Sequence, residues 1–125
     1  MILDTNALSA IGDRDPSLLA FLQQSAVPVL CFVAVAEYQR GLLDSTKPES
    51  GYNMLSSLSA SLTTLHSDNH TPSHYAEIGH LLKKTGRPIP TNDIWIAALA
   101  RQHAMPILSR DRHFDFIPDI QRLTW

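Results

Sequence analysis

Short, nearly all-apolar runs alternate along the chain with longer segments of helical character. The short runs predict strands at residues 1–4, 28–33, 62–66, 106–109 and 121–123. The longer segments predict helices that begin at Pro16 and that span about 34–43, 48–62, 71–84 and 92–103. Apolar strands that alternate with helices are typical of an α/β domain whose mostly parallel sheet is covered by helices.

Local signals define several of these helices further. Asp15 before Pro16 has the residue types preferred at the N-cap and the first position of a helix. Lys83 and Lys84, followed by Gly86, are typical of a helix carboxyl end. Residues 94–100 are apolar on every side, which predicts a helix that is buried all round.

Composition indicates a single compact domain over residues 1–125, because 44% of the residues are hydrophobic and 18% are charged. No apolar run approaches the roughly 20 residues that a membrane span needs, and no secretory signal is visible. The lone Cys31 excludes an internal disulfide or a cysteine-based zinc site, and its apolar surroundings favour a buried thiol. These features together predict a cytoplasmic protein without a membrane partner.

Four acids interrupt the apolar pattern at places where a core would not hold them: Asp4, Glu37, Asp93 and Asp111. Asp4 and Asp111 both follow strands, and the carboxyl ends of parallel strands meet at one edge of a sheet. Ala34 and Gly41 lie one turn to either side of Glu37, and both are small. The helix face formed by these three residues is therefore predicted to lie close to the sheet, with the Glu37 carboxylate pointing inward.

Each of the four acids also has an ordinary structural explanation. Asp93 can favour the dipole of its helix, and Asp4 can cap the turn after its strand. Asp111 can belong to a simple turn, and Glu37 can face solvent if its helix is rotated. It is the joint pattern of all four that favours a shared site.

Converging carboxylates with no nearby lysine need a cation, because two of them about 4 Å apart repel by roughly 4 kcal/mol at an effective dielectric of about 20. All-oxygen ligation favours Mg²⁺ or Mn²⁺ over zinc. The net charge of −2 does not attract nucleic acid over a long range, so a nucleic-acid substrate would need such a local cation.

Four segments in register resemble the motifs of PIN domains, and the subfamily that they resemble most is the VapC toxins. The segments are Ile2-Leu3-Asp4-Thr5-Asn6, Ala36-Glu37-Tyr38-Gln39-Arg40-Gly41, Ile89-Pro90-Thr91-Asn92-Asp93-Ile94-Trp95-Ile96-Ala97-Ala98 and Leu108-Ser109-Arg110-Asp111-Arg112-His113-Phe114. Ser109 stands where the family usually has threonine. Each motif alone is weak evidence, but their order and spacing fit over essentially the whole chain.

The resemblance implies a three-layer α/β/α sandwich around a small parallel sheet. It also implies an endoribonuclease that uses Mg²⁺ or Mn²⁺, whose catalytic and metal-binding acids would be Asp4, Glu37, Asp93 and Asp111. Thr5, Asn6 and Ser109 would support these acids from behind. The implied partners are an RNA substrate, a VapB-like antitoxin that blocks the site, and a second copy of the chain in a homodimer.

Further candidates lie around the fourth acid. Asp115 follows Asp111 by four residues and can supplement or replace it as a ligand. Arg110, Arg112 and His113 are candidates for contacts to RNA. A water nucleophile activated by a metal would leave a 5′-phosphate and a 3′-hydroxyl on the cleaved RNA.

Other functions fit parts of this pattern. A phosphatase that forms an aspartyl-phosphate needs a second aspartate two residues after the first, where this chain has Asn6. A non-catalytic PIN module that binds RNA or protein typically lacks some of the four acids, all of which are present here. A PIN-type RNA-processing nuclease outside a toxin–antitoxin pair shares the same residues, and the gene neighbourhood would discriminate it from a toxin.

Overall fold

The computed structural model describes all 125 residues, which form five short strands, six α-helices and one 3₁₀-helix. The strands are β1 (Ile2–Leu3), β2 (Leu30–Cys31), β3 (Thr64–Leu65), β4 (Ile107–Leu108) and β5 (Arg122–Leu123). The helices are α1 (Thr5–Gly12), α2 (Pro16–Gln23), α3 (Phe32–Leu43), α4 (Pro48–Ser61), α5 (Thr71–Lys84), α6 (Thr91–Gln102) and the 3₁₀-helix η1 (Arg112–Phe116).

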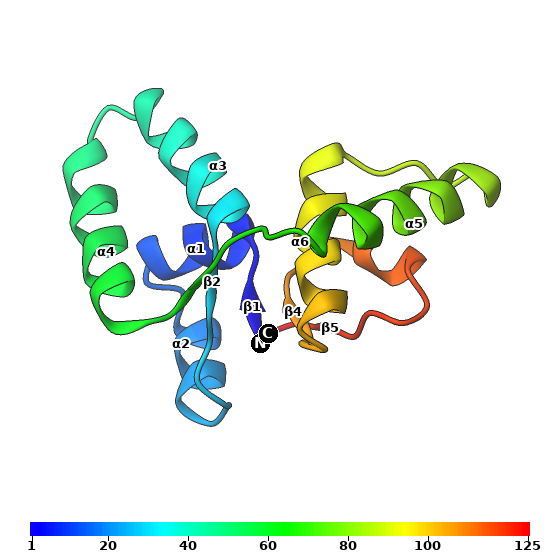
Figure 1. The fold of residues 1–125 in the computed structure, drawn as a ribbon. Helices are drawn as coiled ribbons and strands as arrows, with labels where there is room; N and C mark the ends of the chain where they lie inside the picture. Colours follow the sequence, from blue (N-terminus) through cyan, green and yellow to red (C-terminus); the bar gives the residue numbers. More distant parts are fainter.

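Every strand pair is parallel. One ladder has the order β1-β4-β5, and the other pairs β2 with β3. A bridge between Ile2 and Val29 joins the two ladders, and the N–H of Val29 donates to the carbonyl of Met1 at 2.9 Å. The strands therefore run in the order β3-β2-β1-β4-β5, which confirms the predicted α/β fold with a parallel sheet. Figure 1 shows α1 to α4 on one side of the strands and α5 and α6 on the other.

The strands are shorter than predicted because the chain turns into a helix as soon as each of the first two strands ends. Asp4 caps α1 through a hydrogen bond from the N–H of Thr5, so a helix that the sequence pattern did not predict begins there. Helix α3 begins at Phe32, two residues earlier than predicted, and the residues after Asp111 form η1 rather than a simple turn.

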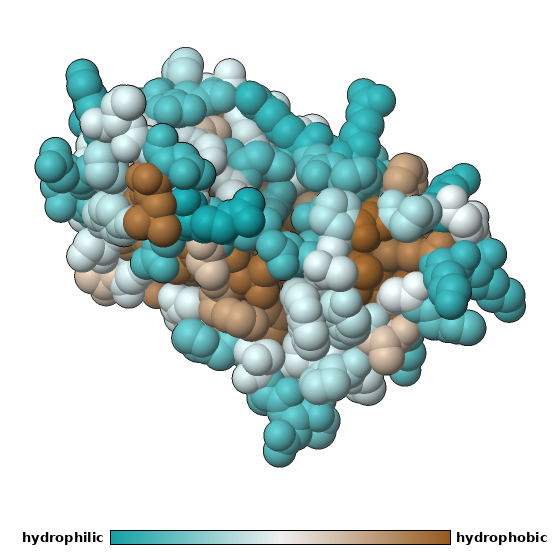
Figure 2. Space-filling model, turned by 90° about the horizontal axis from the view of Figure 1, so that it is seen from above, coloured by the Kyte–Doolittle hydropathy of each residue, from teal (hydrophilic) through white to brown (hydrophobic).

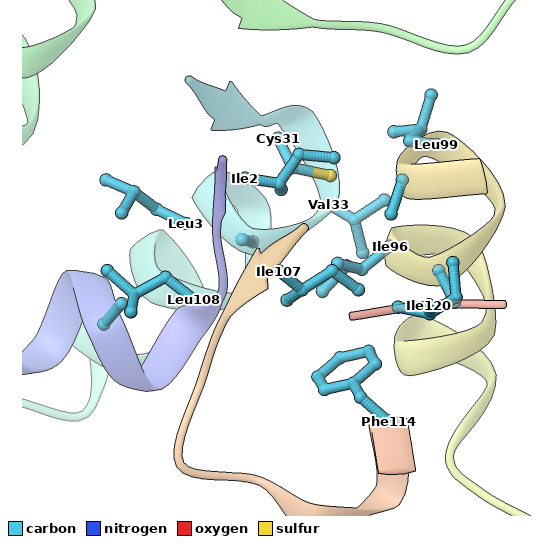
Figure 3. Packing of buried hydrophobic residues seen from close by; sticks show 14 of the residues in the cluster. Ile2, Leu3, Cys31, Val33, Ile96, Leu99, Ile107, Leu108, Phe114 and Ile120 are labelled. Carbon is cyan, nitrogen blue, oxygen red and sulfur yellow. The ribbon is translucent and has the colours of Figure 1, made fainter. Parts of the chain in front are cut away.

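The hydrophobic core lies between the strands and the helices that flank them. All residues of β1, β2 and β4 are fully buried, and so is the predicted buried thiol of Cys31. In α6, Ile96 and its apolar neighbours are buried as predicted, while Trp95 is only partly covered. Figure 3 shows Ile96, Ile107 and Phe114 gathered in one cluster that joins α6, β4 and η1.

The predicted helix ends are confirmed at two places. Asp15 caps α2 by accepting hydrogen bonds from the N–H groups of Ser17 at 2.9 Å and Leu18 at 3.2 Å. Gly86 follows α5 with a φ of +66°, a left-handed conformation that glycine adopts without steric cost. None of the helices combines the length and the hydropathy that crossing a membrane requires.

The chain leaves β1 and β2 at the upper ends of these strands in Figure 1, where it enters α1 and α3. The first residues after these strands therefore meet at one edge of the sheet, as expected for parallel strands. Figure 2 views this end from above and shows apolar surface in a hollow between hydrophilic side chains.

Candidate metal centre

Asp4 lies at the carboxyl end of β1 and is 4% exposed. Its Oδ1 accepts a hydrogen bond from the backbone N–H of Thr5 at 2.6 Å, and its Oδ2 accepts from Asn6 Nδ2 and Ser109 Oγ, both at 2.7 Å. Burial raises the pKa of Asp4, and the negative charges of Glu37 and Asp111 add to this rise, while the hydrogen bonds from Ser109 and Thr5 oppose it. The buried carboxylate is thus held by neutral donors and by no cation.

Glu37 projects from α3 toward the same edge of the sheet. Its Oε2 accepts a hydrogen bond from Thr5 Oγ1 at 2.6 Å, and its Oε1 accepts from Asn92 Nδ2 at 2.7 Å. The prediction that small residues bring this helix face close to the sheet is right for Ala34, which is buried, and wrong for Gly41. Gly41 is exposed, and a Cβ added there would meet nothing within 4 Å. The hydrogen bonds to α1 and α6, rather than a close approach at Gly41, hold the carboxylate in place.

Asp93 and Asp111 lie on either side of His113. Asp93 is buried in the first turn of α6, and Asp111 caps η1 by accepting the backbone N–H of His113 at 2.9 Å. His113 Nδ1 lies 3.2 Å from Asp93 Oδ2 and 3.2 Å from Asp111 Oδ1. Each of the three side chains offers one ligand atom, and these atoms all lie within 4.8 Å of one another.

The electrostatics of the site join all four acids. Burial, together with the negative charges of Asp4 and Asp111, raises the pKa of Asp93 to about 6 in spite of the contact with His113, which acts in the opposite direction. Every arginine that forms an ion pair does so with an acid outside this group of four. A dense set of carboxylates, with one imidazole and no permanent cation, fits a divalent metal ion.

The three polar residues predicted to support the acids lie directly behind them. Ser109 Oγ donates to Asp4 and accepts the backbone N–H of Asp111 at 2.8 Å, so one hydroxyl connects two of the acids. Thr5 connects Asp4 with Glu37 in the same way. Asn6 Nδ2 also contacts Ser109 Oγ at 3.0 Å. This network of neutral donors fixes the carboxylate positions.

Asp115 and Arg110 have partners away from the four acids. Asp115 forms a two-pronged ion pair with Arg122, at 2.7 and 2.8 Å, and the hydrogen bond from Arg122 lowers the pKa of Asp115. The Arg110 guanidinium lies 3.0 Å from Asp15 and 4.4 Å from the ring centroid of Trp125. Arg112 is exposed. Roles for Asp115 as an extra ligand, and for the two arginines as RNA contacts, stay predictions.

Sequence reasoning missed Asn92 and the pocket beside Glu37. Asn92 precedes Asp93 within the third motif, so its position next to an acid was the available signal. The pocket has a volume of about 470 Å³, and Glu37 and Asn92 form part of its wall. Its remaining lining residues are Phe32, Val33, Ala36, Arg40, Ser67 and Trp95.

Comparisons with known proteins show the family to which this chain belongs. The PIN domain family model matches residues 1–119. Ribonuclease VapC1 of Haemophilus influenzae strain R2866 is 30% identical over 129 residues, which cover 99% of this chain and 96% of that protein. Ribonuclease VapC4 of Mycobacterium tuberculosis is 30% identical over 94 residues, which cover 74% of this chain and 72% of that protein.

Solved structures show the same fold. VapBC-1 from nontypeable Haemophilus influenzae matches with a TM-score of 0.84 and 26% identity, covering 99% of this chain and 96% of that one. VapBC2 from Rickettsia felis, bound to a promoter DNA fragment, matches with a TM-score of 0.89 and 23% identity, covering 99% and 97%. The chain described here belongs to the PIN-domain family and, within it, to the VapC ribonucleases.

Proposed function

We propose that this chain is a divalent-metal-dependent endoribonuclease and the toxin of a bacterial toxin–antitoxin pair. The observation that carries the proposal is the convergence of four acids from four separate elements, none of which forms an ion pair with a lysine or arginine. Relatives named ribonuclease VapC, similar over almost the whole chain, support RNA as the substrate.

Asp93 and Asp111, together with Asp4, would hold the metal. Mg²⁺ or Mn²⁺, when bound, lowers the pKa of a water ligand and offsets the charge of the phosphate. Thr5, Asn6 and Ser109 keep the carboxylates in place before substrate arrives, because their hydrogen bonds leave the acid side chains little freedom. Glu37, held by Thr5 and Asn92, lies at the border between the acids and the pocket.

The pocket beside Glu37 has the composition of a site for single-stranded RNA. Phe32 and Trp95 supply aromatic surface on which an unstacked base can lie, and Arg40 supplies a positive charge for a phosphate. Substitution of the exposed Arg40 by alanine should weaken RNA binding more than it lowers thermal stability. Binding titrations with a short RNA and Ca²⁺ in place of Mg²⁺ would measure the effect.

RNA cleavage with Mg²⁺ or with EDTA tests the enzymatic part of the proposal. Asp4→Asn should abolish cleavage, and Asp44→Asn, at an exposed aspartate after α3, should leave it unchanged. Mapping of the product ends should give 5′-phosphates and 3′-hydroxyls. Cleavage that survives both EDTA and Asp4→Asn, or that leaves 2′,3′-cyclic phosphates, would contradict the metal-dependent reaction.

The antitoxin partner is proposed from the solved relatives, which are described as VapBC complexes of toxin–antitoxin systems. Expression of the chain should arrest bacterial growth, and coexpression of a small protein encoded next to its gene should restore it. RNA cleavage without growth arrest or rescue would favour an RNA-processing nuclease, and RNA binding without cleavage would favour a non-catalytic module. The homodimer stays a prediction that sedimentation would test.

A further inference from the structure

The sequence predicts His113 as a candidate RNA contact, but its ring nitrogen lies between two of the acids. Its Nδ1 lies at the same distance, 3.2 Å, from a carboxylate oxygen of Asp93 and from one of Asp111. The local backbone creates this position, because Asp111 caps η1 by accepting the N–H of His113 and so brings the ring back over the acid. The side chain is 41% exposed and can therefore adjust when a ligand enters.

The acids differ in the hydrogen bonds that their carboxylate oxygens accept without a metal. Asp4 and Glu37 have neutral hydrogen-bond donors on both of their carboxylate oxygens. Asp93 has one side-chain partner, which is His113. Asp111 accepts one hydrogen bond, from the backbone N–H of His113. The ligand atoms of Asp93, Asp111 and His113, which lie within 4.8 Å of one another, are therefore the atoms most open to a shared cation.

We propose that His113 binds the metal directly through Nδ1, as a nitrogen ligand beside the carboxylates of Asp93 and Asp111, and that it makes the site prefer Mn²⁺ to Mg²⁺. This inference rests on the proposed metal-dependent function. Mg²⁺ takes oxygen ligands almost exclusively, whereas imidazole nitrogen suits transition metals. An imidazole added to the carboxylates therefore favours Mn²⁺, whereas carboxylates alone suit both ions.

The competing explanation is that His113 is only a hydrogen-bond donor to the two acids, which a metal would displace. The two explanations differ in one ligand atom of the bound ion, which is the nitrogen of His113 in the first and an oxygen in the second. Direct ligation places a nitrogen in the first coordination sphere and leaves the ring proton on Nε2, whereas displacement leaves only oxygen around the ion. Spectroscopy of the bound ion can tell these states apart without a cleavage assay.

Pulsed electron paramagnetic resonance of the purified protein with one equivalent of Mn²⁺ is the decisive measurement. The wild-type protein should show modulation from a directly bound ¹⁴N, which His113→Gln should lack and His103→Gln, at an exposed histidine after α6, should keep. The Kd for Mn²⁺ should rise at least about tenfold in His113→Gln. The Kd for Mg²⁺, measured by competition, should change less than about threefold.

The outcomes separate this inference from the proposed function. Wild-type protein that binds Mn²⁺ without nitrogen coupling would overturn the role of His113 and leave the nuclease proposal intact. Equal weakening of Mn²⁺ and Mg²⁺ binding in His113→Gln would also overturn it, because it would mean a general loss of the site. Absence of binding of either ion to the wild type would contradict the proposed function itself.

Discussion

Replacement of Asp93 by asparagine should stabilise the metal-free protein, although it removes a proposed metal ligand. Asp93 is buried at 8% exposure, and its pKa is raised from 3.8 to about 6. This rise corresponds to about 3 kcal/mol at roughly 1.4 kcal/mol per pKa unit. Water and local relaxation reduce the value in the open, metal-free site, so we expect about 1–2 kcal/mol at pH 7.5.

The pH dependence of the free energy of unfolding shows whether ionised Asp93 destabilises the fold. Between pH 4 and about 6 the folded protein retains a proton on Asp93 that the unfolded chain has already released. The free energy of unfolding of the wild type should therefore fall as the pH rises through this window, and the fall should be smaller in Asp93→Asn. Thermal unfolding in EDTA at pH 7.5 should show a Tm that is roughly 4–8 °C higher in the variant.

Asp115→Asn provides a control in which the Tm should change in the opposite direction. The pKa of Asp115 is lowered by its hydrogen bond from Arg122, so its ionised form favours folding, and its loss should lower the Tm at neutral pH. Mg²⁺ should raise the Tm of the wild type and of Asp115→Asn, and should have little effect on Asp93→Asn. A lower Tm for Asp93→Asn than for the wild type in EDTA at pH 7.5 would refute the reasoning.

Three further predictions concern packing and the hydrogen-bond network. Gly51→Ala should lower the free energy of unfolding in urea by about 1–3 kcal/mol, because the new Cβ would clash with Leu42 Cδ2. Gly79→Ala should raise it by about 0.5–1 kcal/mol, because a Cβ at this position inside α5 meets nothing within 4 Å. Thr5→Val removes the donor to Glu37 but keeps the backbone donor to Asp4, and should slow RNA cleavage roughly 10–100-fold, with recovery in Thr5→Ser. Thr71→Val should lower the free energy of unfolding by roughly 1–3 kcal/mol, because the buried hydroxyl accepts the N–H of Asp68 at 2.9 Å and donates to Gln102 at 2.7 Å.

The sequence pattern located the elements that carry the acids, because each acid interrupts an apolar segment or lies close to one of its ends. It could not locate the boundary between β2 and α3, since Val29 to Ala34 is apolar without a break and the chain is buried or half-buried on both sides of the boundary. It also missed α1, a helix of eight residues that ends in glycine and has weak intrinsic propensity. The burial of Ala7 and Leu8 in the core, rather than local preference, stabilises it.

The side chains around Asp111 were harder to predict for a different reason. The sequence pattern allows a simple turn at Asp111, and it makes Asp115 a candidate ligand only because Asp115 follows Asp111 by four residues. The segment forms a 3₁₀-helix with about three residues per turn, which determines the direction of the side chains after the cap. His113 therefore contacts Asp93, and Asp115 forms an ion pair with Arg122.

The burial of α6 has a consequence for how such a protein can be controlled. Asp93 belongs to a helix whose apolar residues are almost completely enclosed, and Asp4 follows a strand that is entirely enclosed. Neither acid can withdraw without opening the interior of the domain. We therefore expect the proposed toxicity to be silenced from outside, by a second molecule that covers the site.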